Sequence, residues 1–389
     1  MKKEYLGQLT GIRYFLTLIV VLSNMALFSD VDPGFIRKLD WTFFKVLSSA
    51  PVRVDVFFML TGFLLFYIYG QHFSKKIRIR QYFIFFIKRI IRIYPVHALV
   101  LSIIGIAYIF GVWQSLEYFT PDGFQFPHPT QNRIEQPGSF IQNITLTNAW
   151  GLVPYTRASW NGPSWSISIE LINYLIFPFV AFLMMRFNKP HHFAISLLAT
   201  LSLYLYIQMT WINDIGVYVG LGAIFRGFIG MILGIICAQI FLFGKYKNIA
   251  WDYIFVFVLI IIAAMMVRSL TVNDRFDYLF YIPLPFLVLS LAMAKGFIKK
   301  IFSMSWLIHL GNLSFSIYMI HQPFLQIARY FFEGYYGTLD SEGEPILIIM
   351  HLFLIVITMT IIAHLIYTYI ENPVRTWAKQ KIHTQKDLI

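Results

Sequence analysis

Six ionisable side chains lie in or at the ends of long apolar stretches of the sequence. They are Arg13, Asp55, Glu170, Arg226, His321 and Glu371. A charge inside a bilayer is costly, so such a residue marks either a functional site or a pair between helices. Pairing between helices, for example of Glu170 with Arg226, could explain any one of them. It explains all six together less well, and we therefore take Arg13, Glu170 and His321 as candidate catalytic residues.

The first apolar stretch carries Arg13 and Asn24, eleven residues apart. On an α-helix, eleven residues return to within about 20° of the same face, about 16 Å further along the axis. One stripe of this helix would therefore present a cation near its cytoplasmic end and a polar amide near the middle of the membrane. This placement makes Asn24 a candidate site residue together with Arg13.

Two further candidates lie in later apolar stretches. The segment Asn161-Gly162-Pro163-Ser164 predicts a helix start, which places Glu170 about one to two turns into the membrane from the outside. A lone histidine in a helix is more often packed than catalytic. His321 differs because Pro323 and several polar side chains accompany it, namely Ser314, Ser316 and Tyr318.

The most basic run of the chain is the segment 72–95, HFSKKIRIRQYFIFFIKRIIRIYP. Arg89 and Arg92 are three residues apart, so on a helix they share a face. With Lys88 they could bind a cytosolic polyanion. The alternative is a topology anchor that contacts anionic lipid head groups.

The elements that must hold these side chains are long apolar segments. Hydrophobic residues make up 58% of the 389-residue chain and charged residues 13%, below the roughly one quarter of a soluble domain. A membrane helix needs about 20 mostly apolar residues. Such stretches lie at about 10–29, 52–70, 95–113, 165–185, 193–211, 217–241, 251–267, 278–294, 304–331 and 347–370. The sequence therefore predicts an all-α, polytopic membrane helix bundle of about ten helices, forming one domain over residues 1–389.

The basic residues are distributed unevenly between the predicted loops. The net charge of +12 is compatible with nucleic-acid binding, but the positions of the charges indicate a membrane topology instead. If the N-terminus is cytoplasmic, 20 of the 31 lysines and arginines fall in cytoplasmic segments and 8 in outer segments. This bias follows the positive-inside rule. We therefore expect both termini in the cytoplasm, a location in the plasma (bacterial inner) membrane, and no nucleic-acid partner.

The longest predicted connection is the outer loop at about 114–164, which is rich in proline, glycine, asparagine and aromatic residues. A loop of this length is usually either functional or disordered. Its aromatic side chains favour order. They fit equally an interfacial aromatic belt and a lid that faces the substrate.

Seven segments, in this order along the chain, resemble the motifs of the acyltransferase-3 family of membrane acyltransferases. They are LTGIRYFLTLIVVLSN (9–24), VDVFFMLTGFLL (54–65), KRIIRIYP (88–95), SWSISIE (164–170), FRGFIGMILG (225–234), LGNLSFSIYMIHQP (310–323) and YIENPVR (369–375). Each motif alone is weak. Their order and the predicted topology make the resemblance strong, and it covers nearly the whole chain.

The resemblance implies an O-acyltransferase that takes an acyl group, mostly acetyl, from cytosolic acyl-CoA. The implied acceptors are surface or extracytoplasmic carbohydrates, including lipid-linked glycans, O-antigen (and thus lipopolysaccharide) and exopolysaccharide; no metal is implied. Arg13 matches the arginine of the family's first motif. Glu170 and His321 match the acid of its Trp-Ser-x-x-x-Glu element and the histidine of its Tyr-x-x-His-x-Pro element. Lys88, Arg89 and Arg92 match a basic patch that would meet the phosphates of CoA.

Asn24 departs from the family pattern, which has a proposed catalytic histidine at this position. A neutral imidazole can accept a hydroxyl proton near neutral pH, whereas an amide only donates and accepts hydrogen bonds. Three explanations are open. The chain is an inactivated form, or a diverged enzyme that uses His321 or Glu170 as its base, or a member that has lost catalysis.

Three functions from different classes are compatible with these residues. For acyl transfer, acyl-CoA would bind at the basic patch, its thioester would pass Arg13, and the acceptor would enter near Glu170, so that the two meet near position 24. A polysaccharide or lipid transporter is the second, although no pair of short broken helices indicates inverted repeats. The third is a non-catalytic membrane protein that binds acyl-CoA or lipid. This function is compatible with the sequence because Asn24 stands where the family has its histidine.

Overall fold

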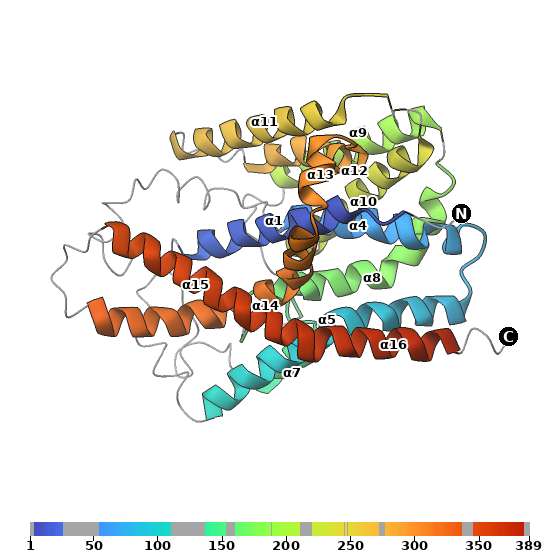
Figure 1. Cartoon of the computed structure of the whole chain (residues 1–389). Helices are drawn as coiled ribbons and strands as arrows, with labels where there is room; N and C mark the ends of the chain where they lie inside the picture. Colours follow the sequence, from blue (N-terminus) through green and yellow to red (C-terminus); the bar gives the residue numbers. More distant parts are fainter. Residues whose placement is uncertain are drawn as a thin grey trace. The chain divides into compact units, whose positions relative to one another are not determined.

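The regular secondary structure in the described part of the chain is helical. The computed structural model describes residues 4–25, 54–109, 137–152, 160–187, 189–210, 220–244, 246, 248–271, 277–336 and 345–384. Every secondary-structure element within these ranges is a helix (Figure 1). The all-α class predicted from the sequence is therefore confirmed.

Contacts divide the chain into two compact units. The first comprises residues 1–16, 49–89 and 169–312, and the second comprises residues 17–48, 90–168 and 313–389. Four helices contribute residues to both units: α1 (Gly7–Met25), α5 (Ile79–Ile109), α8 (Ser164–Met184) and α14 (Ser305–Tyr336).

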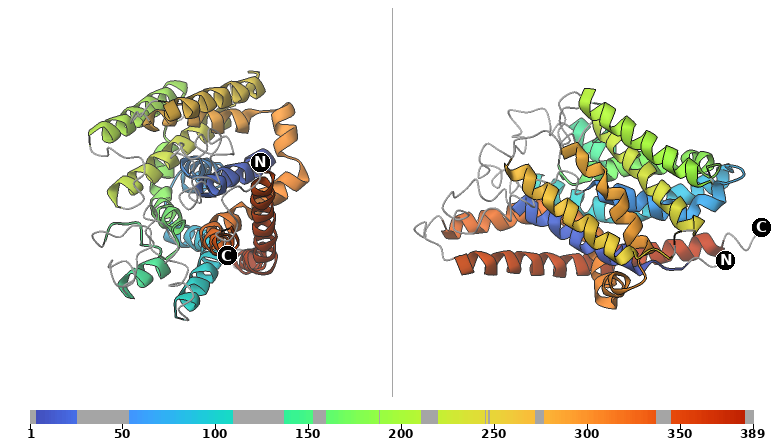
Figure 2. Two further views of the ribbon diagram at one scale, coloured as in Figure 1. Left: turned by 90° about the vertical axis from the view of Figure 1, so that its left-hand side faces the viewer. Right: turned by 90° about the horizontal axis from the view of Figure 1, so that it is seen from above.

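The other elements each belong to one unit. Those of the first unit are α4 (Asp55–Tyr69), the 3₁₀ turn η3 (Gly70–Phe73), α9 (Pro190–Thr210), α10 (Leu221–Phe243), α11 (Trp251–Thr271), the 3₁₀ turn η5 (Asp277–Tyr281), α12 (Pro283–Met293) and α13 (Phe297–Phe302). Those of the second unit are α7 (Pro137–Ile144), α15 (Pro345–Ile366), the π-helical turn η6 (Tyr367–Glu371) and α16 (Asn372–Thr384). The last three follow one another without a break as a single long helical run (Figures 1 and 2).

Six segments within the described ranges are long and apolar enough to cross a membrane. They are Asp55–Phe73, Ile79–Ala107, Ser164–Met184, Leu221–Phe243, Trp251–Arg268 and Leu352–Lys381. They correspond to six of the ten predicted spans. The spans predicted at 10–29, 193–211 and 304–331 fall on α1, α9 and α14, although residues 26–29 and 211 lie outside the described residues.

Two predicted boundaries differ from the structure. The span predicted at 278–294 contains a 3₁₀ turn and a helix of only 11 residues, because Pro283 and Pro285 start a new helix at that point. The span predicted to begin at about residue 95 is the later part of α5, which is helical from Ile79 and contains Pro95. Most of the basic run therefore belongs to the same helix as the span that follows it. A proline removes only one backbone hydrogen bond, and a long membrane helix can tolerate that loss.

Helices α4 and α10 pack closely along their length in the first unit (Figure 1). Gly230 and Gly234 of α10 form a G-x-x-x-G motif, which lets two helix backbones approach each other in a membrane. A Cβ atom at Gly234 would lie 1.9 Å from the backbone oxygen of Met59, and one at Gly230 would lie 2.8 Å from the Cβ of Phe58. The glycines therefore set the distance between the two helices.

Replacing Gly234 with alanine should destabilise the protein by about 1–3 kcal/mol, because the added methyl group forces α4 and α10 apart. Thermal unfolding in detergent can be followed with a thiol-reactive dye, since Cys237 is the single cysteine of the sequence and is buried on α10. Gly138→Ala is the matched control, because a Cβ there would meet nothing within 4 Å. Equal unfolding temperatures for the two variants would contradict the close packing.

Candidate active site

Two of the candidate site residues are in direct contact in the second unit. Asn24 Nδ2 lies 2.9 Å from His321 Nε2. Nearer the start of both helices, Thr17 Oγ1 lies 3.5 Å from the backbone oxygen of Ser314. Both contacts join α1 to α14, and the Thr17–Ser314 contact precedes the Asn24–His321 contact by seven residues, about two turns, on each helix. The two helices therefore run in the same direction with Asn24 and His321 on their facing sides.

The hydrogen bonds of His321 define the roles of its two ring nitrogens. Nδ1 lies 2.5 Å from the backbone oxygen of Tyr318. A carbonyl can only accept, so Nδ1 carries the proton and donates it. Nε2 of the neutral ring is then an acceptor, and the Asn24 amide donates to it. The basic nitrogen of His321 is thus occupied by the side chain at position 24.

The start of α8 holds α14 in place around His321. Asn161 Nδ2 donates to the backbone oxygen of Met319 at 3.1 Å, and the hydroxyls of Ser166 and Tyr318 are 3.0 Å apart. A Cβ at Gly162 would lie 2.0 Å from Gln322 Oε1, so only glycine fits there without movement. The helix start predicted at residues 161–164 therefore also positions the turn of α14 that carries His321.

Glu170 has its own hydrogen-bond partners in the first unit. Its Oε1 atom accepts from Thr61 Oγ1 at 3.0 Å and from the Tyr174 hydroxyl at 2.5 Å. Two donors on one oxygen stabilise the carboxylate and fix its orientation. Arg13 is half-buried on α1, which is helical from Gly7 to Met25, as the spacing of Arg13 and Asn24 required.

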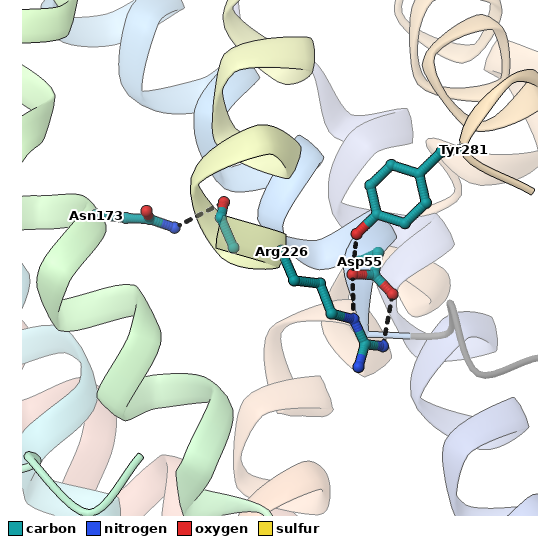
Figure 3. A network of polar contacts seen from close by, with 5 residues as sticks. Asp55, Asn173, Arg226 and Tyr281 are labelled. Atoms are coloured by element: carbon teal, nitrogen blue, oxygen red, sulfur yellow. Dashed lines mark hydrogen bonds and ion pairs between the residues drawn. The ribbon is translucent and has the colours of Figure 1, made fainter. Parts of the chain in front are cut away.

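Arg226 pairs with Asp55, a different partner from the one given as an example from the sequence. Arg226 Nε and Nη2 lie 2.7 Å from the two carboxylate oxygens of Asp55. The Tyr281 hydroxyl donates to the same carboxylate, which therefore lies between guanidinium and phenol (Figure 3). Asp55 and Arg226 are 0% and 2% exposed, so this is a fully buried ion pair. A planar guanidinium matches a carboxylate in this two-bond geometry.

The three basic candidates of α5 have different environments. The guanidinium of Arg89 lies 4.7 Å from the centre of the Tyr69 ring, and the residue is buried. Its Nε atom has no hydrogen-bond partner among the described residues. Lys88 and Arg92 are half-buried. An anion reaching Arg89 would therefore meet a guanidinium already oriented by an aromatic ring.

The sequence did not identify several residues that hold these groups. Tyr281 lies within the span predicted at 278–294 and carries no pattern that points to Asp55. Thr61 and Tyr174 are polar side chains within apolar spans, and Tyr174 lies four residues from Glu170, a spacing that places both on one helix face. That spacing was the one available signal.

The chain is similar to proteins of known families. A family profile described as an acyltransferase domain, Acyl_transf_3, matches residues 6–368. The chain is 27% identical over 176 residues to acyltransferase MdmB of Streptomyces mycarofaciens, covering 44% of this chain and 38% of MdmB. It is 25% identical over 396 residues to O-acetyltransferase OatA of Staphylococcus aureus, covering 96% of this chain and 57% of OatA.

A putative O-acetyltransferase of Staphylococcus aureus is 23% identical over 397 residues, covering 96% of this chain and 58% of that protein. This chain thus spans little more than half the length of these O-acetyltransferases. No solved structure matches it. The family match covers nearly the whole chain and agrees with its apolar helices, and the chain is a member of the acyltransferase-3 family of multi-pass integral membrane acyltransferases.

Proposed function

We propose that this protein transfers an acetyl group from cytosolic acetyl-CoA to a hydroxyl of an extracytoplasmic carbohydrate. The relatives that cover most of the chain are named O-acetyltransferases, which supports oxygen as the acceptor atom. A surface glycan such as O-antigen or exopolysaccharide presents such hydroxyls. The observation that carries the proposal is the hydrogen bond between position 24 and His321.

This contact has the geometry of an oriented catalytic group. In nucleophilic and general-base sites, the base is commonly held by a third group on its far side. Here His321 is fixed by the backbone oxygen of Tyr318 and presents Nε2 toward the side chain at position 24. His321 is therefore built to orient whatever residue occupies position 24.

The reaction needs one proton transfer at this point. The acceptor oxygen forms a bond to the thioester carbonyl carbon, and the carbon–sulfur bond breaks. The hydroxyl proton passes to the base and then to the departing thiolate, which leaves as the free thiol of CoA. Asn24 has no basic atom for this step. In the present chain the proton must therefore go to one of two groups. One is His321 Nε2, once the Asn24 amide no longer donates a hydrogen bond to this nitrogen. The other is the Glu170 carboxylate.

The remaining candidates serve binding and electrostatics in this proposal. Lys88, Arg89 and Arg92 bind the phosphates of acyl-CoA from the cytoplasm. Arg13 contributes a positive charge on the same helix as position 24, where negative charge develops on the thioester oxygen during attack. Both termini lie in the cytoplasm, as the distribution of lysine and arginine favours.

Transfer of label from radiolabelled acetyl-CoA in membrane vesicles tests this proposal. Inside-out vesicles expose the cytoplasmic face, so they should incorporate label into carbohydrate, whereas sealed right-side-out vesicles should not. The Asn24→His variant is assayed beside the present chain, because we expect the present chain to react slowly. Vesicles without the protein provide the background.

Three other outcomes of this experiment would contradict the proposal. Movement of carbohydrate across the membrane without incorporation of label would indicate a transporter. Binding of acyl-CoA without turnover in either variant would indicate a non-catalytic binding protein. Incorporation of label only in right-side-out vesicles would contradict the proposed orientation.

A further inference from the structure

Two carboxylates within the described apolar spans are buried and paired with arginine. Asp55 accepts from Arg226 on both oxygens at 2.7 Å, and its side chain is 0% exposed. Glu371 accepts from Ser316 Oγ at 2.9 Å on Oε2 and from Arg375 Nη1 at 3.0 Å on Oε1, with 3% of its side chain exposed. Both oxygens of each group are therefore engaged, and each negative charge lies beside a guanidinium.

The carboxylate of Glu170 on α8 has a different environment. Both of its described donors are uncharged hydroxyls, and both bind the same oxygen, Oε1: Thr61 Oγ1 at 3.0 Å and the Tyr174 hydroxyl at 2.5 Å. Within the described residues, no donor reaches Oε2 and no cation pairs with Glu170. The side chain is half-buried rather than buried. A carboxylate oxygen in an apolar span is costly without a donor, so Oε2 offers a place for a donor that a bound molecule brings.

Helix α8 is fixed on both sides of this carboxylate. Asn173 follows Glu170 by three residues, and its Nδ2 donates to the backbone oxygen of Gly227 on α10 at 3.1 Å (Figure 3). Tyr174 follows Glu170 by four residues, so the two side chains share one face of α8. Tyr174 is only 1% exposed, and its packed ring therefore holds the hydroxyl in place against Oε1.

Helix α4 holds the second donor. Thr61 precedes Gly62, at which a Cβ atom would lie 2.1 Å from the backbone oxygen of Met231 on α10. The backbones of α4 and α10 are therefore in direct contact beside Thr61, as small residues allow in a membrane. Because α4 and α8 are both tied to α10, the two hydroxyls hold Oε1 from two fixed helices, and they set the direction of Oε2.

We propose that Glu170 Oε2 accepts a hydrogen bond from the hydroxyl of the acceptor, and that Thr61 and Tyr174 are positioning residues that direct Oε2 toward it. This inference rests on the proposed function, in which the acceptor atom is a hydroxyl oxygen. A hydroxyl supplies the donor that Oε2 lacks, and a hydrogen bond to a charged oxygen is stronger than one between neutral groups. The resemblance in sequence marks Glu170 and gives no role to either hydroxyl.

Dicyclohexylcarbodiimide tests the positioning without turnover. This apolar reagent modifies protonated carboxyl groups within membranes, and mass spectrometry of the full-length protein in nanodiscs locates the adduct at Glu170. Thr61→Val and Tyr174→Phe should each raise the rate of modification about tenfold, because each removes a hydrogen bond that favours the ionised form. Thr61→Ser keeps the hydroxyl and should react at the parent rate.

Transfer shows whether the acceptor uses the oriented oxygen. In the Asn24→His background, where we expect a large signal, incorporation of label from acetyl-CoA into vesicle carbohydrate should fall about tenfold in Thr61→Val and in Tyr174→Phe. Binding of acetyl-CoA should not change, and Thr61→Ser should retain the rate. A purely structural connection between α4 and α8 predicts instead that the folded variants transfer at the parent rate.

Tyr82→Phe is the matched control for both measurements. The Tyr82 hydroxyl joins α5 to α8 through the backbone oxygen of Leu175 at 3.0 Å, so this variant removes a neighbouring connection of the same kind and keeps the donors of Glu170. It should leave modification and transfer unchanged. Accessibility of the buried Cys237 confirms that each variant is folded.

Unchanged modification of Glu170 in both hydroxyl variants would overturn the positioning roles. Faster modification with unchanged transfer would reduce the three side chains to a structural connection, which also overturns the proposal. Absence of transfer in every variant would refute the transferase proposal itself. Faster modification in the two hydroxyl variants would then still support the positioning of Glu170 by Thr61 and Tyr174, and unchanged modification would overturn it.

Discussion

Replacing Asn24 with histidine should raise acyl transfer by about 10²–10⁴-fold, the usual contribution of general acid–base catalysis. In the present chain, the Asn24 amide donates to His321 Nε2 at 2.9 Å. An imidazole at position 24 could donate to the same nitrogen through one of its ring atoms. Its other ring nitrogen would then carry a free lone pair, which is the basic atom that the amide lacks.

Three companion variants show whether the gain comes from an oriented base. Asn24→Gln keeps the amide and should stay at the background rate. The double variant Asn24→His with His321→Ala should lose most of the gain, because the new imidazole loses its orienting partner. Asn24→His with Arg13→Ala should also lose most of it, if Arg13 stabilises the developing negative charge.

The rates are measured in one membrane preparation with matched expression and with the natural acceptor supplied. The transfer rate of Asn24→His should rise with pH as the imidazole loses its proton, whereas a purely structural effect would not have this pH profile. Equal background rates in the present chain and in Asn24→His, with acyl-CoA binding intact, would refute the interpretation as a disabled enzyme. Full activity of the present chain that His321→Ala abolishes would instead place the base on α14.

The sequence predicted most helices closely because the requirement for a long apolar segment is simple and local. The starts of α8 and α11 agree with the predicted spans within one residue, and α10 begins at Leu221 rather than at 217. Errors occurred at prolines. Pro95 is accommodated within α5, while Pro283 begins the short helix α12. The same residue type has opposite effects, and tertiary packing decides between them.

The pairing of side chains could not be predicted in the same way. In a membrane protein both the buried and the lipid-facing sides of a helix are apolar, so the sequence gives little information on how each helix is rotated. Asn24 and His321 were both candidates, but their contact depends on the register of α1 against α14, which the Thr17 contact with Ser314 shows. Arg226 could have paired with either Glu170 or Asp55, and only the structure identifies Asp55.

Removing one partner of the buried Asp55–Arg226 pair should destabilise the protein by about 3–5 kcal/mol. Removing one partner of a buried ion pair leaves the other charge without compensation in a low-dielectric interior. Asp55→Asn leaves the Arg226 cation, and Arg226→Met leaves the Asp55 carboxylate with Tyr281 as its remaining described donor. Tyr281→Phe should cost less, about 1–3 kcal/mol, because it removes one hydrogen bond and no charge.

The double variant Asp55→Leu with Arg226→Met distinguishes a structural pair from a functional one. Replacing both charges with apolar side chains of similar volume is often neutral or stabilising, so this variant should recover most of the lost stability. Unfolding is followed through the reactivity of Cys237, which lies on the same helix as Arg226 and is buried. Single variants that unfold at the same denaturant concentration as the parent would contradict the predicted cost.

Activity of the double variant then assigns the role of the pair. It is best measured in the Asn24→His background, where we expect a large signal. A stable and active double variant would show that Asp55 and Arg226 only connect α4 to α10. A stable variant that binds acyl-CoA but does not transfer the acyl group would show that the charges themselves take part in the reaction. We expect the first result, because Asp55 and Arg226 already satisfy each other through two hydrogen bonds of 2.7 Å.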